Sequence, residues 1–388
     1  MRIGRGRAVL GALCAVAAVV AGVATASPRA ARTVAHTPLI VGLQDDRMAD
    51  PVTDPGPRMA LVAGVRARLV RVDLRWDLVA RSRPQTPTDP GDPAYDWSHY
   101  DAVVAAARAR GIQVLFAVWG TPAWAGDDTT PDGRFPSFGR APRDPADAGA
   151  FATAAAARYT PQGVTRWEMW NEPNIPLFLR PQYRRVGTRW EAASPAVYAA
   201  IASAMYAGIK SVDPAARVAG GVTAPVGDPD PQNCANQPEC RVRPQDFLRA
   251  LDAPGLRPPM DAWAHHPYPL RKPSTVTPPG ISYVDLYNLT VLTRALDRSY
   301  LAGTPVWLTE FGFATRRTAE YPFHVNRAQQ ALFMADAFRR VRANPRVRVF
   351  VWYLLQDHPD WASGLYTMAG RAKPAAALFR SQAPRGRG

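Results

Sequence analysis

The sequence predicts an α/β protein with a single-domain (β/α)8 barrel (a TIM barrel), and three features of the chain support this prediction. Eight short runs of apolar, β-branched and aromatic residues recur at intervals of about 30 to 50 residues. Helical patterns lie between many of these runs. The segments that follow the runs are long, whereas the returns to the next run are short. This asymmetry is typical of barrels, whose longer loops gather at the carboxyl ends of the strands.

Each of the eight predicted strands is short and largely apolar, as expected for a parallel strand that is buried on both faces. They span Leu39–Leu43, Leu69–Leu74, Gln113–Trp119, Thr165–Trp170, Arg217–Val222, Met260–Ala264, Pro305–Thr309 and Arg348–Tyr353. An open, doubly wound sheet is the alternative to a closed barrel. Such a sheet usually carries a glycine-rich phosphate loop after its first strand, and the segment 42–46, Gly-Leu-Gln-Asp-Asp, is not such a loop.

The predicted helices have apolar residues at helical spacing and recognisable ends. They span Trp97–Arg110, Ala148–Tyr159, Ser194–Val212, Gln245–Leu251, Tyr283–Tyr300 and Asn326–Ala343. Gly111 follows the first of them and suits a left-handed helix cap. The long segments that we expect on the rim of the active-site face are Arg81–Asp96, Gly126–Ala146, Ile175–Ala193 and Ala224–Arg243.

Residues 1–26 have the order of a secretory signal peptide, with an arginine-rich start, the apolar run Ala8–Val23 and small residues before the cleavage point. An uncleaved membrane anchor is the alternative, because the run is only slightly shorter than a membrane-spanning helix. We expect residues 27–36 to be a disordered leader, residues 37–380 to be the folded domain and residues 381–388 to be a flexible tail. The mature protein is then secreted or held at the cell surface.

Only two cysteines, Cys234 and Cys240, follow the predicted signal peptide. An even pair at short spacing in an exported protein predicts a local disulfide. A metal site would need further cysteine or histidine ligands at fixed spacing, and none lie near the pair in the sequence. We therefore expect no metal there.

The chain is basic, with a formal net charge of +15. The basic residues are scattered and form no run with interleaved aromatic residues, so the sequence predicts no nucleic-acid binding. Weak attraction to an anionic polysaccharide stays open. No segment after the signal peptide is apolar enough to cross a membrane, so stable membrane insertion is not expected after cleavage.

Glutamate is rare, with six residues in the chain, and two of the six follow predicted strands in apolar, aromatic surroundings. These are Glu172, after the fourth strand, and Glu310, after the seventh. A carboxylate in such surroundings is costly, and functional sites are where this cost is commonly tolerated. Glycoside cleavage needs one carboxylic acid to protonate the leaving oxygen and one carboxylate to attack carbon or activate water. In an eight-stranded barrel the two glutamates would face each other across the mouth.

At these two places the sequence resembles clan A of the glycoside hydrolases. The motifs are Trp-Asn-Glu-Pro-Asn at 170–174 and Thr-Glu-Phe-Gly at 309–312. Together with Trp-Gly-Thr-Pro-Ala-Trp-Ala at 119–125, they resemble family 39 and its bacterial endoglycosidase-like members, with family 5 the next closest. The resemblance implies that Glu172 is the general acid/base, that Glu310 is the nucleophile, and that the anomeric configuration is retained. It also implies that Glu172 has the higher pKa of the two.

The resemblance assigns further residues to the substrate site. Asn171 would bind the sugar 2-hydroxyl, and Arg71 would support the nucleophile. His266 and Tyr268 would lie beside the nucleophile. Trp352 would be the aromatic platform under the cleaved sugar, with Trp119, and after it Trp124, as further platforms. Outside the resemblance, we expect Glu168 to form a buried structural ion pair with Arg71, because Glu168 shares a strand face with Trp170 and could reach the Arg71 side chain.

These observations predict a secreted, retaining β-glycosidase that acts on a polysaccharide or oligosaccharide, with internal cleavage favoured, no cofactor and a monomeric state. A transglycosylase using the same residues is one alternative. A non-catalytic carbohydrate-binding barrel is the other, although the presence of both glutamates argues against it. The sequence lacks the motifs of serine hydrolases, zinc proteases, kinases and dinucleotide-dependent enzymes.

Overall fold

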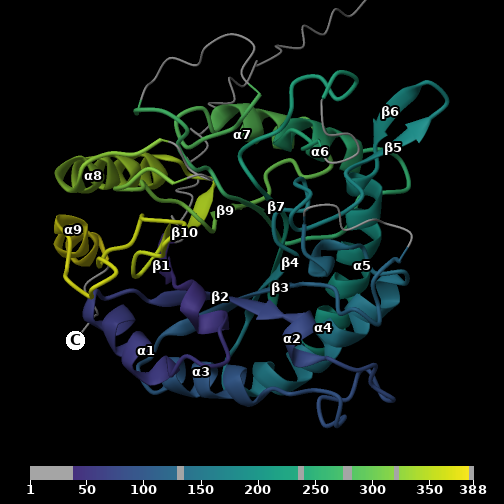
Figure 1. Cartoon of the computed structure of the whole chain (residues 1–388), viewed down its shortest axis with the longest axis horizontal. Helices are drawn as coiled ribbons and strands as arrows, with labels where there is room; N and C mark the ends of the chain where they lie inside the picture. Colours follow the sequence, from purple (N-terminus) through teal and green to yellow (C-terminus); the bar gives the residue numbers. More distant parts are fainter. Residues whose placement is uncertain (1–37, 129–134, 235–239, 274–281, 319–322, 384–388) are drawn as a thin grey trace, which may run out of the picture. The chain divides into compact units, whose positions relative to one another are not determined.

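Eight parallel strands close into a barrel, and the helices lie around its outside (Figure 1). This computed structural model describes residues 38–128, 135–234, 240–273, 282–318 and 323–383. The strands are β1 (Ile40–Gln44), β2 (Leu69–Arg75), β3 (Gln113–Trp119), β4 (Arg166–Met169), β7 (Arg217–Thr223), β8 (Ala262–His265), β9 (Val306–Leu308) and β10 (Val347–Tyr353). The predicted barrel is confirmed, and each strand overlaps its predicted span. The predicted signal peptide (1–26) and leader (27–36) lie outside the described residues.

The barrel closes because β1 pairs in parallel register with both β2 and β10. The neighbouring strands then follow in the order β10, β9, β8, β7, β4, β3 and β2. This order places the ends of β4 and β9 on well-separated parts of the barrel wall, with β7 and β8 between them on one side. Side chains that follow β4 and β9 can therefore approach each other from two walls of one cavity.

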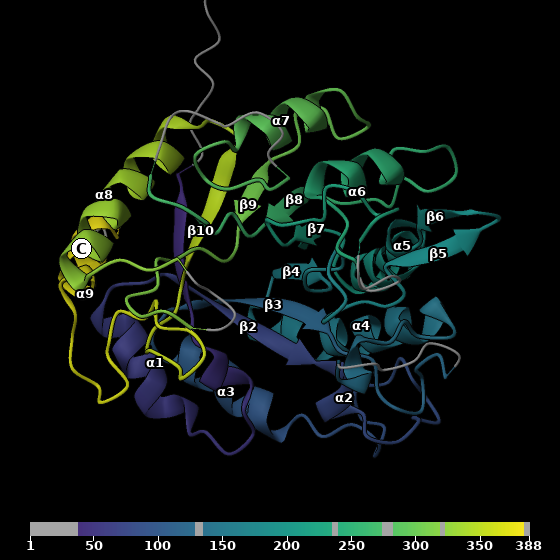
Figure 2. The same cartoon turned by 45° about the horizontal axis from the view of Figure 1, so that its top comes forward.

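The helices pack outside the strands in both views (Figures 1 and 2). They are α1 (Pro55–Gly64), α2 (Trp76–Val79), α3 (Ser98–Arg108), α4 (Pro145–Tyr159), α5 (Ser194–Val212), α6 (Pro244–Leu251), α7 (Thr290–Asp297), α8 (Arg327–Ala343) and α9 (Pro374–Gln382). Short 3-10 helices lie at Asp46–Ala49, Ser137–Gly139 and Thr160–Gln162. Gly111 adopts the expected left-handed backbone, with a φ of 62°, after α3.

One predicted helix needs correction, and two helices of more than one turn were not predicted. The predicted helix Tyr283–Tyr300 is reduced to α7, because the Asp285 side chain accepts bonds from the backbone of Tyr287 and Asn288 and holds a non-helical turn there. Helix α1 was not predicted, although its start carries an Asp54 cap on the Gly56 N–H. Helix α9 was also not predicted, and it extends to Gln382, into the first part of the predicted tail 381–388.

The segment between β4 and α5, predicted as a long loop, contains a two-stranded antiparallel hairpin. Its strands are β5 (Tyr183–Val186) and β6 (Arg189–Ala192). Figures 1 and 2 show this hairpin projecting outward beside α5 and α6. Gln232 fixes it to the segment after β7, because its side-chain amide bonds both the N–H and the carbonyl of Trp190.

The core has an inner part within the barrel and an outer part between the strands and helices. Strand β10 illustrates the alternation that separates the two. Val349 and Val351 belong to the inner cluster. Phe350 belongs to the outer core, where its ring contacts Phe338 of α8. Trp352 shares the outer face with Phe350, which leaves Tyr353 pointing toward the barrel interior.

Candidate active site

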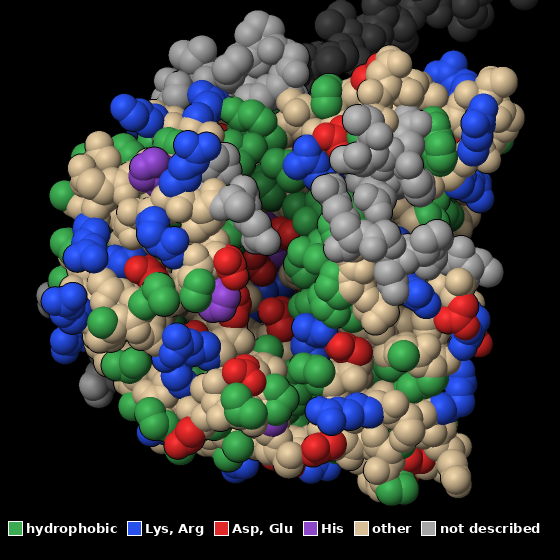
Figure 3. All heavy atoms as spheres, viewed as in Figure 1, with side chains coloured by type: hydrophobic (Ala, Val, Ile, Leu, Met, Phe, Trp, Pro, Cys, Tyr) green, Lys and Arg blue, Asp and Glu red, His purple; other side chains and the backbone are tan. Residues whose placement is uncertain are grey.

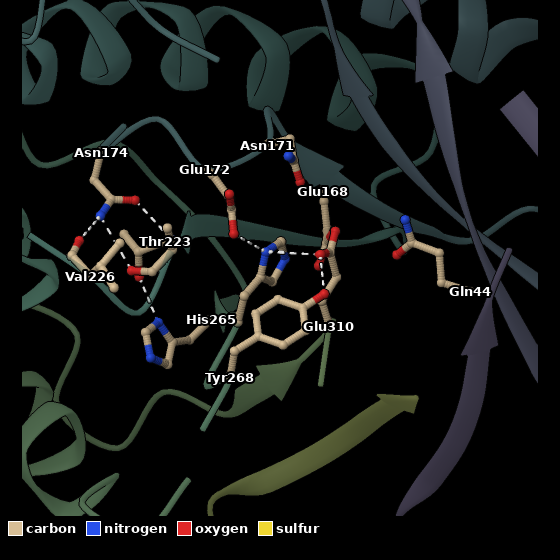
Figure 4. Close-up of polar contacts among 12 residues, drawn as sticks. Gln44, Glu168, Asn171, Glu172, Asn174, Thr223, Val226, His265, Tyr268 and Glu310 are labelled. Atoms are coloured by element: carbon tan, nitrogen blue, oxygen red, sulfur yellow. Dashed lines mark hydrogen bonds and ion pairs between the residues drawn. The ribbon is translucent and has the colours of Figure 1, made fainter. Parts of the chain in front are cut away.

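The predicted site residues meet at the carboxyl ends of the strands. Glu172 follows β4 and Glu310 follows β9, and both are largely buried, with 9% and 7% of their surface exposed. Figure 4 shows the side chains of Glu172, Tyr268 and Glu310 converging on one region. One carboxylate oxygen of each glutamate and Nδ1 of His266 all lie within 4.8 Å of one another. Figure 3 shows a hollow in the centre of this face, with acidic side chains at its floor.

Both carboxylate oxygens of Glu310 accept a hydrogen bond from a buried donor. The Arg71 Nη1 group lies 2.6 Å from Oε1, and the Tyr268 hydroxyl lies 2.7 Å from Oε2. Donors of this kind stabilise the ionised carboxylate, and two of them fix its orientation. The expected positions of Arg71 and Tyr268 beside Glu310 are therefore found in the structure.

Arg71 is fully buried and connects several parts of the site. Its Nε donates to Glu168 at 2.7 Å, and its Nη2 donates to Asn171 Oδ1 at 2.8 Å. Its Nη1 also donates to the side-chain oxygen of Gln44 at 2.6 Å. The predicted ion pair with Glu168 is confirmed, and the guanidinium holds Asn171 and Glu310 in a fixed relation.

Glu172 has a different environment from Glu310. Its Oε1 lies 2.8 Å from Nδ1 of His266, which was expected beside the nucleophile and is 3.6 Å from Glu310. Burial lowers the pKa of His266 well below its ordinary value, so its imidazole is neutral. Burial raises the pKa of Glu172 to about 8, against the opposing effect of Arg71. Burial raises the pKa of Glu310 well above its ordinary value, against the opposing effect of Arg71 and with a further rise from the neighbouring Glu172.

Strained backbone positions the end of β4. Trp170 and Glu172 have φ values of 76° and 38°, in a region that residues other than glycine rarely adopt. The Glu172 N–H donates to the Val222 carbonyl of β7 at 2.9 Å, and the Trp170 indole donates to the Phe178 carbonyl at 2.8 Å. The neighbouring strand and the following loop thus hold the turn that directs Glu172 into the site.

The second asparagine of the 170–174 motif anchors the same turn. Asn174 is fully buried, and its side-chain amide donates to the carbonyls of Ala224, Val226 and Val242. Its oxygen accepts the Ala224 N–H at 2.8 Å. Asn174 thus ties the turn after β4 to the segment after β7, and Figure 4 shows it turned away from the glutamates.

The glycine of the 309–312 motif permits a close approach between strands. A Cβ at Gly312 would overlap the Tyr353 carbonyl at the end of β10 and would crowd Ser363. Only glycine fits this contact, which keeps the segment carrying Glu310 against Tyr353.

The prediction for Trp352 is wrong. Trp352 is fully buried, its indole N–H donates to the Ser363 carbonyl, and its ring contacts Phe311 in the outer core. The prediction placed the Trp352 side chain on the wrong face of β10. Trp352 points out of the barrel with Phe350 and offers no surface to a sugar. Tyr353, the next residue, points into the site instead.

The predicted sugar platform at Trp119 has little surface to offer a sugar. Trp119 is only 5% exposed, and the Arg75 guanidinium lies over its ring at 4.4 Å. The rings of Phe138 and Phe178 contact it as well. Trp119 therefore packs within the loops of the rim.

Trp124 is half-buried, and an arginine also lies over its ring. Its indole donates to the Ala80 carbonyl, and Arg83 covers its ring at 4.6 Å. His265 lies outside the site, because its ring nitrogens bond Thr223 and the Val284 carbonyl.

The structure adds residues that the sequence reasoning did not place in the site. Gln44 lies at the end of β1, and its amide nitrogen lies 3.0 Å from Asp46 and 3.4 Å from Asp73. Asp46 also accepts the Tyr353 hydroxyl. The alternation of inward and outward side chains along β1 and β10 could have identified Gln44 and Tyr353. Asp46 lies in the segment after β1, and no local sequence pattern predicts its contact with Tyr353.

Among the described residues, two groups of side chains have the composition of metal ligands. Cys234 and Cys240 lie near Asp228, but the two cysteines form the predicted disulfide, which removes both thiolates as ligands. The second group is Glu172, His266 and Glu310. There the positive charge beside Glu310 is supplied by Arg71, which would repel a cation in the same place.

No protein-family model matches the sequence, and no curated protein matches it. In fold, the chain is similar to a family 39 glycoside hydrolase from Bacteroides cellulosilyticus WH2, with 20% identity, a TM-score of 0.61, and coverage of 90% of this chain and 64% of that one. The chain thus spans a little under two thirds of that protein. It is also similar to a GH39 β-xylosidase from Caulobacter crescentus, with 20% identity, a TM-score of 0.60, and coverage of 88% and 70%.

A third similar structure is a GH5_18 protein from Streptomyces cattleya in complex with GlcNAc, with 15% identity, a TM-score of 0.59, and coverage of 89% and 79%. At these identities the similarity establishes the fold. The expected resemblance to family 39, with family 5 next, is confirmed at that level.

Proposed function

We propose that this protein is a retaining β-glycosidase that hydrolyses O-glycosidic bonds of a polysaccharide or oligosaccharide. The observation that carries the proposal is the pair of buried carboxyl groups at the ends of β4 and β9, which share one cavity and differ in their hydrogen-bond partners. Two buried carboxyl groups facing each other are what glycoside cleavage requires.

The different partners support different roles for the two glutamates. Glu310 accepts bonds from the charged Arg71 and from the Tyr268 hydroxyl, so the negative charge is best placed on Glu310. Burial raises the pKa of both carboxyl groups, to about 8 for Glu172, so the pair holds a proton at neutral pH. Because Glu172 faces a neutral imidazole instead of a cation, that proton is best placed on Glu172. Glu172 is accordingly the general acid and Glu310 the nucleophile.

The reaction proceeds in two displacements. Glu310 attacks the anomeric carbon while Glu172 donates its proton to the glycosidic oxygen, so the bond to the leaving group breaks and a glycosyl–Glu310 ester forms. Glu172, now ionised, then takes a proton from water as that water attacks the same carbon and releases Glu310. The separation of under 4.8 Å between carboxylate oxygens supports direct attack, because inverting enzymes keep the two groups about 6.5 to 9.5 Å apart to admit water.

Export, internal cleavage and a monomeric state belong to the same proposal. The disulfide between Cys234 and Cys240 supports an oxidising compartment. The similarity in fold to solved glycoside hydrolases supports a carbohydrate substrate. Among the described residues no helix combines the length and apolar character that crossing a membrane would need.

The test is hydrolysis of aryl β-glycosides, with the anomer of the released sugar followed by proton NMR from the first minutes. We expect the β-anomer to appear first and to mutarotate later. First appearance of the α-anomer would contradict retention. Binding of oligosaccharides without turnover of any glycoside would favour the non-catalytic barrel, and products longer than the substrate would favour a transglycosylase.

A further inference from the structure

We infer that a wall beside Glu310, formed by Asp46, Asp73, Tyr353 and Trp361, binds the sugar that is cleaved and selects a neutral sugar over a uronic acid. We call these four residues the acidic–aromatic wall. They come from β2, from the end of β10 and from the segments that follow β1 and β10. The inference rests on the proposed function, since it names the substrate class of the same site.

The aromatic residues of the wall, Tyr353 and Trp361, contact Tyr268, which donates a hydrogen bond to the nucleophile Glu310. The Trp361 ring lies 5.0 Å from the Tyr268 ring and 5.6 Å from the Tyr353 ring, and those two tyrosine rings are 5.8 Å apart. Tyr268 itself donates to Glu310. Tyr353 and Trp361 are half-buried, whereas Trp352 has no exposed surface. They can therefore present aromatic surface to the C–H faces of a sugar ring, which Trp352 cannot.

The acidic half offers hydrogen-bond acceptors at the same place. Gln44 bridges the Asp46 and Asp73 carboxylates through its amide nitrogen, while its oxygen accepts from Arg71. Both aspartates are half-buried and keep some exposed surface. Asp73 Oδ1 has no hydrogen-bond partner among the described residues, and its contact with Arg71 is long, at 3.4 Å. Carboxylates accept and do not donate, so this half of the wall fits sugar hydroxyls, which can donate.

The charge at the wall excludes a further carboxylate. Glu168, Glu310 and Asp73 all form ion pairs with one cation, the Arg71 guanidinium. Burial and the neighbouring Asp73 raise the pKa of Asp46 to about 7, so Asp46 adds its full negative charge to this field only above that pH. A uronic acid would bring a like charge into this partly buried region, where Arg71, the cation that the described residues place at the wall, already pairs with three carboxylates. A neutral pyranoside meets no such penalty.

The test compares aryl β-glycosides that share a leaving group and differ only at C5: the glucoside, the xyloside and the glucuronide, with the galactoside and galacturonide as a second series. We expect kcat/KM for each uronide to be lower than for its neutral partner by at least about a hundredfold. Asp46→Asn with Asp73→Asn should reduce that ratio by about tenfold or more. Equal turnover of a uronide and its neutral partner, or a ratio unchanged in the double variant, would overturn the inference.

Measuring sugar binding in an inactive variant tests this inference separately from the proposed function. Glu310→Gln retains the wall and should not turn over substrate, so calorimetric titration with cellotetraose and with its uronic-acid counterpart reads the wall alone. Binding of the neutral sugar only supports the inference, even where no glycoside is hydrolysed. Binding of both alike, or of neither, overturns it.

The aromatic half is tested by Trp361→Ala, which should lower kcat/KM for neutral glycosides about 10- to 100-fold with little change in Tm, because the ring is half-buried. Trp361→Phe should restore most of the loss, since it keeps an aromatic face. Unchanged kcat/KM in Trp361→Ala would remove Trp361 from the wall.

Discussion

At the scale of single residues, the two glutamates differ in what surrounds them rather than in how deeply they are buried. Glu310 has Arg71 and Tyr268 as donors, and Glu172 has a neutral His266. The resemblance to clan A predicted both glutamates and four of their neighbours, namely Arg71, Asn171, His266 and Tyr268. No motif predicts that Asp46 and Trp361 lie in the site. Their contacts depend on how the segments after β1 and β10 fold over the mouth of the barrel.

Glu310→Ala should lower kcat by at least about a thousandfold on every glycoside, because no other carboxylate can attack the anomeric carbon. Added azide should restore turnover and give the α-glycosyl azide, identified by NMR. Glu191→Gln, a charge change on the exposed strand β6, is the control and should retain full activity.

Glu172→Ala should lose about 100- to 10,000-fold on natural oligosaccharides and much less on dinitrophenyl glycosides, whose leaving groups need little protonation. Steady-state rates on the two substrate classes provide the measurement. Should Glu172→Ala fail on both classes while Glu310→Ala spares the activated one, the two roles are reversed.

At the scale of elements, strand alternation decides which aromatic residue reaches the site. The sequence predicted β10 correctly, but its inward face could not be assigned without knowing that Val349 and Val351 fill the barrel. The helix predicted at Tyr283–Tyr300 failed for a local reason, the turn held by Asp285. The hairpin β5–β6 was missed because its exposed residues lack an apolar alternation.

Trp352→Phe should lower the free energy of unfolding by about 1 to 3 kcal/mol, because it removes buried volume and the bond to the Ser363 carbonyl. It should leave kcat/KM on neutral glycosides within about threefold of the wild type, in contrast to Trp361→Ala. Denaturant titration and steady-state kinetics measure the two effects. A large loss of activity at unchanged stability would return Trp352 to the sugar site.

The disulfide belongs to the segment between β7 and α6, which also holds the hairpin through Gln232. Replacing both Cys234 and Cys240 by serine should lower stability by about 2 to 3 kcal/mol, because the bridge closes a short loop. Turnover of a short substrate should stay near normal, because neither cysteine contacts a catalytic glutamate. Thermal unfolding and kinetics of the double variant decide this. A collapse in turnover without unfolding would mean that this segment shapes the catalytic subsite.

At the scale of the whole molecule, the charge of the chain and the charge of the site have opposite signs. The chain carries a formal net charge of +15, whereas the cavity gathers Glu168, Glu310, Asp46 and Asp73 around Arg71. The overall charge is therefore a poor guide to the substrate. An attraction of the surface to anionic polymers, which the sequence leaves open, and the inferred exclusion of uronic acids from the site are compatible, because they concern different regions.

The buried acids make the stability of the whole fold depend on pH. Burial raises the pKa of Glu172 from 4.5 to about 8 and that of Asp46 from 3.8 to about 7. Between its ordinary pKa and its raised native pKa, each group holds a proton in the native state that it has released in the unfolded chain. The contribution of these two groups to the free energy of unfolding is therefore complete below about pH 4 and is lost as pH rises through their native pKa values. Each such group lowers the free energy of unfolding by at most about 1.4 kcal/mol per pH unit in that window.

We therefore expect urea titrations to give a lower free energy of unfolding at pH 8 than at pH 5.5. Glu172→Gln should flatten this dependence, because the amide occupies the same place without titrating, whereas the surface change Glu191→Gln should leave it unaltered. The same ionisation should lower activity above about pH 8, since ionised Glu172 cannot protonate the leaving oxygen. If the wild type and Glu172→Gln have the same pH dependence of stability, Glu172 is already ionised in the native protein at pH 5.5, and its assignment as the general acid fails.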